Sequence, residues 1–311
     1  MNLPATQTAL DEQLSKLVPL IGYVIFLVVF AGVAFGALAF YRLVTSSDSS
    51  RQTRAQGQLW PPEPQEILRA SDHVNDGKHH LLLAATGSVA TIKIPNIVDA
   101  LSRHSNLSIR IVLSESAAKF LQSQSHEQPS LEQIKRIKNV DGIYRDEDEW
   151  RKPWVRGDSI LHIELRRWAD MMAIVPLSAN SLAKLAGGLS DSLITSVARA
   201  WDATGIIDAA RPGVPLPYNG KKGIIVAPAM NTAMWAHPVT GKHIETLSSE
   251  WGVQKGGWIE LLRPIEKELA CGDTGSGAMR DWREVVKTIE ERLDLPSLPT
   301  ETLTNGIAKH G

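Results

Sequence analysis

The sequence contains one cysteine, Cys271, among 311 residues. A lone thiol forms neither an internal disulfide nor a cysteine-based structural metal site, so both stabilising devices are excluded and no metal centre is expected. Basic and acidic residues nearly balance, with a formal net charge of -1. This balance gives no sign of the positive surface that nucleic-acid binding needs, and we expect no nucleic-acid partner.

Two common phosphate-binding motifs are also missing. The turn at 86–89, TGSV, does not match the GxGxxG fingerprint of dinucleotide-binding domains, and no GxxxxGK[ST] loop occurs. These absences argue against an NAD-binding or ATP-hydrolysing domain of the usual kinds.

Charged residues are absent between Leu17 and Tyr41. A helix of this length crosses the roughly 30 Å hydrocarbon core of a bilayer. The run is too long for a signal peptide, and no basic segment precedes it. Because basic residues are more frequent after the run, we expect a single-pass transmembrane helix at 17–42, with the following domain in the cytosol. The alternatives are a buried core helix or a misassigned start; without this segment the protein would be cytoplasmic.

Short apolar runs alternate with helical patterns from Lys78 onward. This order is typical of a parallel sheet with helices on its faces, and therefore of an α/β fold. The expected organisation is an N-terminal tail (1–16), the transmembrane helix (17–42), a linker (43–77), the α/β domain (78–295) and a flexible C-terminal tail (296–311).

Four of these runs predict strands that end in small, hydroxylated or amide residues. They are His80–Ala85, Leu107–Leu113, Met171–Val175 and Gly223–Ala227. Ligands of open parallel sheets bind outside the carboxyl ends of the strands. Four such loops favour a flat, phosphate-bearing ligand held by hydroxyls and backbone N–H groups, although ordinary strand-to-helix turns use the same residue types.

Residues 158–170 predict a short helix capped by Asp158 or Ser159. With its apolar positions facing the sheet, His162 and Arg166 would lie side by side on the outer face. Such a pair suits carboxylate binding or proton transfer, although a lone helical histidine is more often a surface residue.

Two further positions leave alternatives open. Asn231 follows a predicted strand and either caps the next helix or offers a donor and an acceptor to a ligand. Cys271 lies in the glycine-rich segment ACGDTGSGAM, which suits a loop that closes over a ligand, whereas a free cysteine is often a small buried apolar residue.

Six segments, in the same order, resemble the phosphopantothenoylcysteine decarboxylases of the homo-oligomeric flavin-containing cysteine decarboxylase family. They are GSVATIK (87–93), LHIELRRWAD (161–170), PLSANSLAKLAGGLSD (176–191), ARAWD (198–202), PAMNTAMW (228–235) and LACGDTGSGAM (269–279). The resemblance covers residues 78–292 and does not extend to the first 77.

The resemblance implies a flavodoxin-like, Rossmann-type doubly wound sheet in three αβα layers, assembled as a homotrimer with FMN between subunits. It further implies a carboxy-lyase that converts 4′-phosphopantothenoylcysteine to 4′-phosphopantetheine and CO₂ in coenzyme A biosynthesis. Transient oxidation of the cysteine thiol by the flavin would make the loss of CO₂ possible.

The matching positions carry the implied roles. His162 and Cys271 would be catalytic, with Cys271 as a proton donor on a closing flap. The substrate-binding positions would be Asn231, Arg167, Ala270 and Met279. The FMN-binding positions would be Gly87, Ser88, Val89, Ser114, Ser116, Ser178, Ala179, Asn180, Ser181, Ala229 and Met230.

The sequence also departs from the family pattern. The apolar segment 17–42, the long loop 203–222 and the stretch Arg280–Trp282, where Ala-Glu is commoner, are not part of it. Some fungal relatives instead inhibit a Ser/Thr protein phosphatase, and inhibition of such a phosphatase partner is the alternative function. The chain keeps His162, Asn231 and Cys271 and does not end in an acidic tail, which favours an enzyme. A flavin enzyme acting on peptide C-terminal cysteine or on prenyl transfer is disfavoured by the AWD and ACGD segments.

Overall fold

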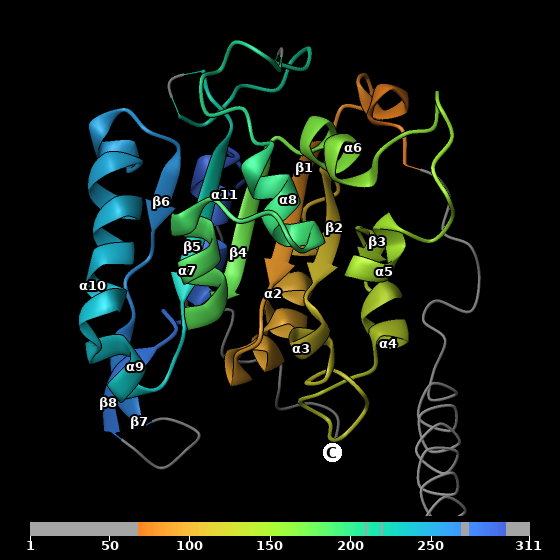
Figure 1. Ribbon diagram of the computed structural model, residues 1–311. Coiled ribbons are helices and arrows are strands. Elements are labelled where there is room, and N and C mark those ends of the chain that lie inside the picture. Colours follow the sequence, from red (N-terminus) through yellow and green to blue (C-terminus); the bar gives the residue numbers. More distant parts are fainter. Residues whose placement is uncertain (1–67, 209, 219, 269–273, 297–311) are drawn as a thin grey trace, which may run out of the picture. The chain divides into compact units, whose positions relative to one another are not determined.

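The computed structural model describes residues 68–208, 210–218, 220–268 and 274–296. Within them, six parallel strands form one sheet in the order β3-β2-β1-β4-β5-β6 (Figure 1). Its strands are β1 (His79–Ala85), β2 (Leu107–Leu113), β3 (Val140–Tyr144), β4 (Met171–Leu177), β5 (Gly223–Pro228) and β6 (Ile259–Leu261). A separate antiparallel pair consists of β7 (Ile265–Glu268) and β8 (Thr274–Ala278). The expected parallel α/β sheet is confirmed.

Helices cover both faces of the sheet, with α7 and α8 in front and α11 behind in the view of Figure 1. The α-helices are α2 (Ile94–Leu101), α3 (Glu115–Ala118), α4 (Leu131–Lys135), α5 (Asp146–Glu149), α6 (Leu161–Trp168), α7 (Ala179–Gly187), α8 (Leu193–Arg199), α9 (Thr232–Ala236), α10 (Pro238–Glu245) and α11 (Trp282–Arg292). Short 3-10 helices are η1 (Ala70–His73), η2 (Val89–Lys93) and η4 (Val253–Lys255), and η3 (Thr246–Glu250) is a π-helical turn. Pro95 lies in the first turn of α2.

The central strands are buried on both faces, which explains their continuous apolar sequences. Every residue of β2, β4 and β5 is buried, and so are six of the seven residues of β1. Strands β3 and β6 were not among the predicted strands; they are shorter and flank the four predicted ones. The core therefore lies on both faces of the four central strands.

The loop 203–222 has no helix or strand within its described residues, as expected for an inserted loop, but buried charges anchor it. Arg211 donates to Asp170 at 2.6 and 3.0 Å. Asp202 accepts backbone N–H groups from Thr204, Gly205, Ile207 and Asp208 at 2.8–3.0 Å. One carboxylate therefore organises the first turn of the loop.

The packed domain begins before Lys78. Leu68 and Ala70 are buried, and the Ala70 N–H donates to Glu164 of α6 at 2.7 Å. Residues 68–77, which the sequence assigns to the linker, thus pack on the domain. Among the described residues no helix is long and apolar enough to span a bilayer, and the segment 17–42 lies outside them.

Candidate functional site

The strand order reverses between β1 and β4. From β1 the chain proceeds through β2 to β3 at one edge of the sheet, and from β4 it proceeds through β5 to β6 at the other edge. Ligands of open α/β sheets bind at this switch point, at the carboxyl ends of the strands. Here Thr86 joins the two loops. Its hydroxyl donates to the Pro176 carbonyl at 3.0 Å and accepts the Ser178 N–H at 2.7 Å. The loops after β1 and β4 are therefore held as one unit.

A cavity of about 790 Å³ opens at this edge of the sheet. Its volume falls within the usual range of roughly 300–1,000 Å³ for small-molecule pockets. The loops after β1, β2, β4 and β5 all reach it. Every position expected to bind FMN lines this cavity, and these are Gly87, Ser88, Val89, Ser114, Ser116, Ser178, Ala179, Asn180, Ser181, Ala229 and Met230.

The lining suits a phosphate-bearing group. A Cβ at Gly87 would lie 2.3 Å from Ser116 Oγ, so only glycine lets the backbone approach the loop after β2 this closely. Ser114 and Ser116 present hydroxyls 3.3 Å apart. Ser178 caps α7 at the cavity, and the partial positive charge of a helix N-terminus favours an anion. Hydroxyls and backbone groups, without a metal ligand set, form this cradle.

Asn231 and the base of the β7–β8 hairpin meet at the same cavity. Asn231 caps α9 by accepting the Ala233 N–H at 2.8 Å, and it also lines the cavity, so both sequence readings of this residue fit. The Met230 N–H donates to the Gly277 carbonyl at 3.0 Å. A Cβ at Gly277 would lie 2.2 Å from the Met230 carbonyl oxygen. The hairpin base is therefore in direct contact with the Asn231 loop.

Met279 also lines the cavity, directly after β8. Ala270 and Cys271 belong to the segment 269–273, which lies outside the described residues. The described strands on either side, β7 and β8, pair with each other and carry this segment. The structure thus places the base of the expected flap at the cavity.

His162 does not line the cavity, and neither does Arg167. Helix α6, which carries both residues, precedes the amino-terminal end of β4, whereas the cavity lies at the carboxyl ends. Glu149 of α5 accepts hydrogen bonds from the His162 backbone N–H at 3.0 Å and from its ring Nδ1 at 2.9 Å. Sequence reasoning missed Glu149, because only the fold brings it to the start of α6.

Two details predicted for α6 are wrong. Arg166 is buried: it forms an ion pair with Asp208 at 3.0 Å, so it does not lie with His162 on an exposed face. Neither Asp158 nor Ser159 caps the helix, which begins after Ile160 without a side-chain cap. Glu149 accepts the His162 N–H in place of a capping side chain. Asp208 of the inserted loop forms the ion pair with the buried Arg166.

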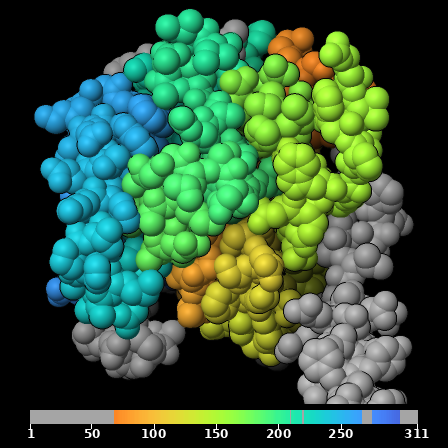
Figure 2. Space-filling view, viewed as in Figure 1, coloured from red at the N-terminus to blue at the C-terminus, as the bar shows by residue number. Residues whose placement is uncertain are grey.

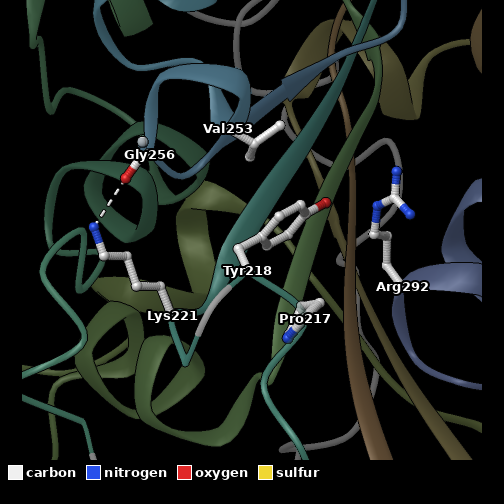
Figure 3. Close-up of a pocket in the computed structure, with 7 residues that line it drawn as sticks. Pro217, Tyr218, Lys221, Val253, Gly256 and Arg292 are labelled. Carbon is white, nitrogen blue, oxygen red and sulfur yellow. Dashed lines mark hydrogen bonds between the residues drawn. The ribbon is translucent and has the colours of Figure 1, made fainter.

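A second cavity, of about 420 Å³, lies where β5 and β6 begin, at the opposite edge of the sheet (Figure 3). Lys221 donates to the Gly256 carbonyl at 2.9 Å, and Arg292 forms two hydrogen bonds with Glu260, at 2.7 and 2.8 Å. Tyr218 donates to the same carboxylate at 2.5 Å; burial and the charge of Glu260 hold the pKa of its phenol well above the usual range. Both charged side chains of this lining are already engaged, Lys221 by a backbone carbonyl and Arg292 by Glu260, so this cavity is the weaker candidate for a ligand site.

Comparison with known proteins places these features in a family. Residues 69–294 match the family model described as Flavoprotein. A probable phosphopantothenoylcysteine decarboxylase from Arabidopsis thaliana is 44% identical over 212 residues, covering 68% of this chain and 87% of the relative. A probable thymidylate synthase from Schizosaccharomyces pombe is 38% identical over 229 residues, covering 74% of this chain; the matched part is only 32% of that protein's length.

Solved structures show the same fold. A cysteine-to-serine mutant of a PPC decarboxylase, complexed with pantothenoylaminoethenethiol, has a TM-score of 0.53 at 38% identity and covers 68% of this chain and 97% of its own. The FMN binding protein AtHal3 has a TM-score of 0.52 at 38% identity, covering 71% of this chain and 100% of its own.

Proposed function

Because this chain belongs to the Flavoprotein family, we propose that it is an FMN-dependent carboxy-lyase that converts 4′-phosphopantothenoylcysteine to 4′-phosphopantetheine and CO₂ in coenzyme A biosynthesis. One observation carries this proposal: four strand-end loops and the base of the β7–β8 hairpin converge on a single cavity lined by every residue expected to hold FMN. The similarity to decarboxylases along nearly their whole length supports the same activity.

Gly87, Ser88, Ser114 and Ser116 would hold the phosphate of the cofactor, and Ser178 and Met230 would line its ribityl chain and ring. When bound, FMN supplies a reversible two-electron oxidation of the substrate thiol. The oxidised group stabilises the electron pair that remains on the substrate when CO₂ departs.

The chain's own groups have separate tasks. The Asn231 amide binds the substrate carboxylate at the cavity wall. The His162 ring donates through Nδ1 to Glu149, which leaves Nε2 free to accept a proton from the substrate thiol. Cys271 returns a proton to carbon after CO₂ leaves, and the segment that carries it shields the site from water.

We further propose that three copies assemble, so that His162 and Arg167 of one copy complete the cavity of a neighbour. Their separation from the cavity within one chain supports this arrangement. The segment that precedes α6 exposes large apolar side chains, namely Trp150, Trp154 and Val155, each more than half exposed. In Figure 2 the yellow-green segment at 145–160 lies on the surface, where a neighbouring copy would cover it.

The test is to purify residues 68–311, record a flavin absorption spectrum and measure CO₂ release from phosphopantothenoylcysteine. The protein should be yellow and active. The Cys271→Ser variant should bind FMN and release CO₂ but accumulate a product two hydrogens poorer than phosphopantetheine. Normal turnover by that variant would remove Cys271 from the reaction, and colourless, inactive wild-type protein would reject the function.

Residues 17–42 are proposed to anchor the enzyme in a membrane, with the catalytic domain in the cytosol; a form without them would be cytoplasmic. The full chain should float with liposomes in a density gradient, and a variant lacking residues 1–45 should stay in the soluble fraction with full activity. Equal flotation of both proteins would contradict the anchor.

Inhibition of a Ser/Thr phosphatase stays a separate prediction, tested by adding the purified protein to the phosphatase.

A further inference from the structure

Four basic side chains line the main cavity, and two of them are already paired. Lys119 forms an ion pair with Glu115 at 2.9 Å, and Lys184 forms one with Asp191 at 2.5 Å. Lys93 and Arg280 also line the cavity, and within the described part of the chain their side chains have no ion-pair or hydrogen-bond partner. Two positive charges at this site are therefore available to a ligand.

Lys93 and Arg280 enter the cavity from neighbouring helix starts. Lys93 ends η2 and immediately precedes α2, and Arg280 immediately precedes Asp281, the N-cap of α11. Helices α2 and α11 pack against each other. The positive end of the α2 dipole adds to the two side-chain charges, whereas that of α11 is met by its own cap, Asp281. Together they form a positive rim on the side of the cavity where these helices begin.

No carboxylate of the described cavity lining is available to neutralise this rim. Asp281 accepts the Arg283 N–H at 2.8 Å as the helix cap, and Glu115 is held by Lys119. Asp146 accepts the Leu193 N–H at 2.7 Å, and burial raises the pKa of its carboxyl group. The matching ligand group is therefore an anion, and a guanidinium with an ammonium suits a phosphate monoester.

Two phosphate monoesters would enter this cavity, one on FMN and one on the substrate. The cradle of Gly87, Ser114 and Ser116 already offers the FMN phosphate two hydroxyls and a close approach to the backbone. Arg280 instead directly follows Met279, the position expected to touch the substrate. The substrate carries its phosphate at the end far from the reacting cysteine, so a second phosphate site is required.

We propose that Lys93 and Arg280 bind the terminal phosphate of the substrate and select the phosphorylated over the unphosphorylated pantothenoylcysteine. This inference rests on the proposed function. It assigns a specificity role to Lys93 and Arg280. Each charge-assisted contact is expected to contribute about tenfold to the preference.

The experiment measures kcat/KM for phosphopantothenoylcysteine and for pantothenoylcysteine. In the double variant Lys93→Gln/Arg280→Gln the ratio of the two values should fall by about a hundredfold, with FMN content unchanged. Arg280→Lys should keep part of the preference. The control, Lys242→Gln/Arg263→Gln, removes the same charge from exposed positions outside the cavity and should keep the wild-type ratio.

An unchanged ratio in the Lys93/Arg280 double variant would overturn the inference. Loss of FMN with an unchanged ratio would overturn it too, because the two cations would then serve the cofactor phosphate. If wild-type protein releases CO₂ from neither compound, the proposed function fails, and calorimetry with 4′-phosphopantothenate and pantothenate tests the phosphate site alone. Equal binding of 4′-phosphopantothenate by wild-type and double-variant protein would then refute the site.

Discussion

Glu149 holds His162 through both of its carboxylate oxygens, one bonded to the ring Nδ1 at 2.9 Å and the other to the backbone N–H at 3.0 Å. The Glu149 side chain is only 6% exposed, whereas the imidazole is 26% exposed. The carboxylate is thus buried behind the ring, and the ring keeps one edge accessible. This arrangement fixes which nitrogen of His162 faces outward.

Replacing Glu149 should therefore impair catalysis without emptying the cavity. Glu149→Ala is expected to lower kcat by about ten- to a hundredfold, because the ring loses its fixed orientation, while the flavin spectrum stays unchanged. Glu149→Gln keeps an acceptor oxygen and should be intermediate. Glu147→Ala is the matched control, because that side chain is 56% exposed and pairs with Arg145 instead. Equal rates for Glu149→Ala and the control would exclude the positioning role.

Mixed assemblies should separate the two halves of the proposed active site. His162→Asn and Asn231→Ala should each be inactive alone, but co-expressed chains would place an intact His162 beside an intact cavity. If chains mix at random, each site is complete with a probability of one half times one half. The mixed protein should therefore show about a quarter of the wild-type activity. CO₂ release by the mixed, co-purified protein is the measurement. No recovery in demonstrably mixed assemblies would show that His162 and the cavity of one chain act together.

A methyl group at Gly277 should displace the base of the flap. The added Cβ would lie 2.2 Å from the Met230 carbonyl oxygen, so the hairpin must shift away from the Asn231 loop. Gly277→Ala is expected to cost about 1–3 kcal/mol of stability and to lower kcat/KM by about tenfold. Gly241→Ala is the control, because a methyl group there would have nothing within 4 Å and alanine favours the helix. Matching activity in the two variants would show that the flap base adjusts freely.

Asp202 should make the stability of the inserted loop depend on pH. Burial opposes ionisation of this carboxyl, but bonds from the Asp208 and Thr204 N–H groups and the Thr204 hydroxyl outweigh it and hold its pKa well below the usual range. A depressed folded-state pKa gives stability that is present above the unfolded pKa of about 3.9 and lost as the pH falls below it.

Asp202→Asn should accordingly reduce the free energy of unfolding by about 1–3 kcal/mol at neutral pH. The difference from wild type should shrink as the pH drops below about 4. Urea unfolding at several pH values measures it, with the exposed Asp99→Asn as the control. A difference that stays constant down to low pH would show that the carboxylate charge is not the cause.

The sequence predicted the elements whose signal is local. The four buried strands are long apolar runs, and their polar ends converge because parallel strands share one carboxyl edge. Strand β3, with the sequence VDGIY, and the three-residue β6 carry too little apolar pattern to be recognised alone. Their pairing with neighbours is decided by the rest of the sheet.

Contacts made by the fold account for what was missed at the site. His162 meets Glu149 across 13 positions of the chain, and Arg166 meets Asp208 from the inserted loop. Helical spacing alone predicted Arg166 on an exposed outer face, and this prediction is wrong because Arg166 is buried and paired with Asp208 of the inserted loop. Charge pairing between distant segments cannot be read from periodicity.

The Thr86 hydroxyl has one more consequence. It accepts the Ser178 N–H and donates to Pro176, so neither strand-end loop can drift without stretching a bond to the other. A cofactor analogue altered at its phosphate would consequently disturb the ring end as well, and the two ends would tighten or loosen together. Thr86→Val, which keeps the shape but removes that oxygen, would leave backbone contacts alone to couple the two loops, among them the bond from the Thr86 N–H to the Pro176 carbonyl at 3.0 Å.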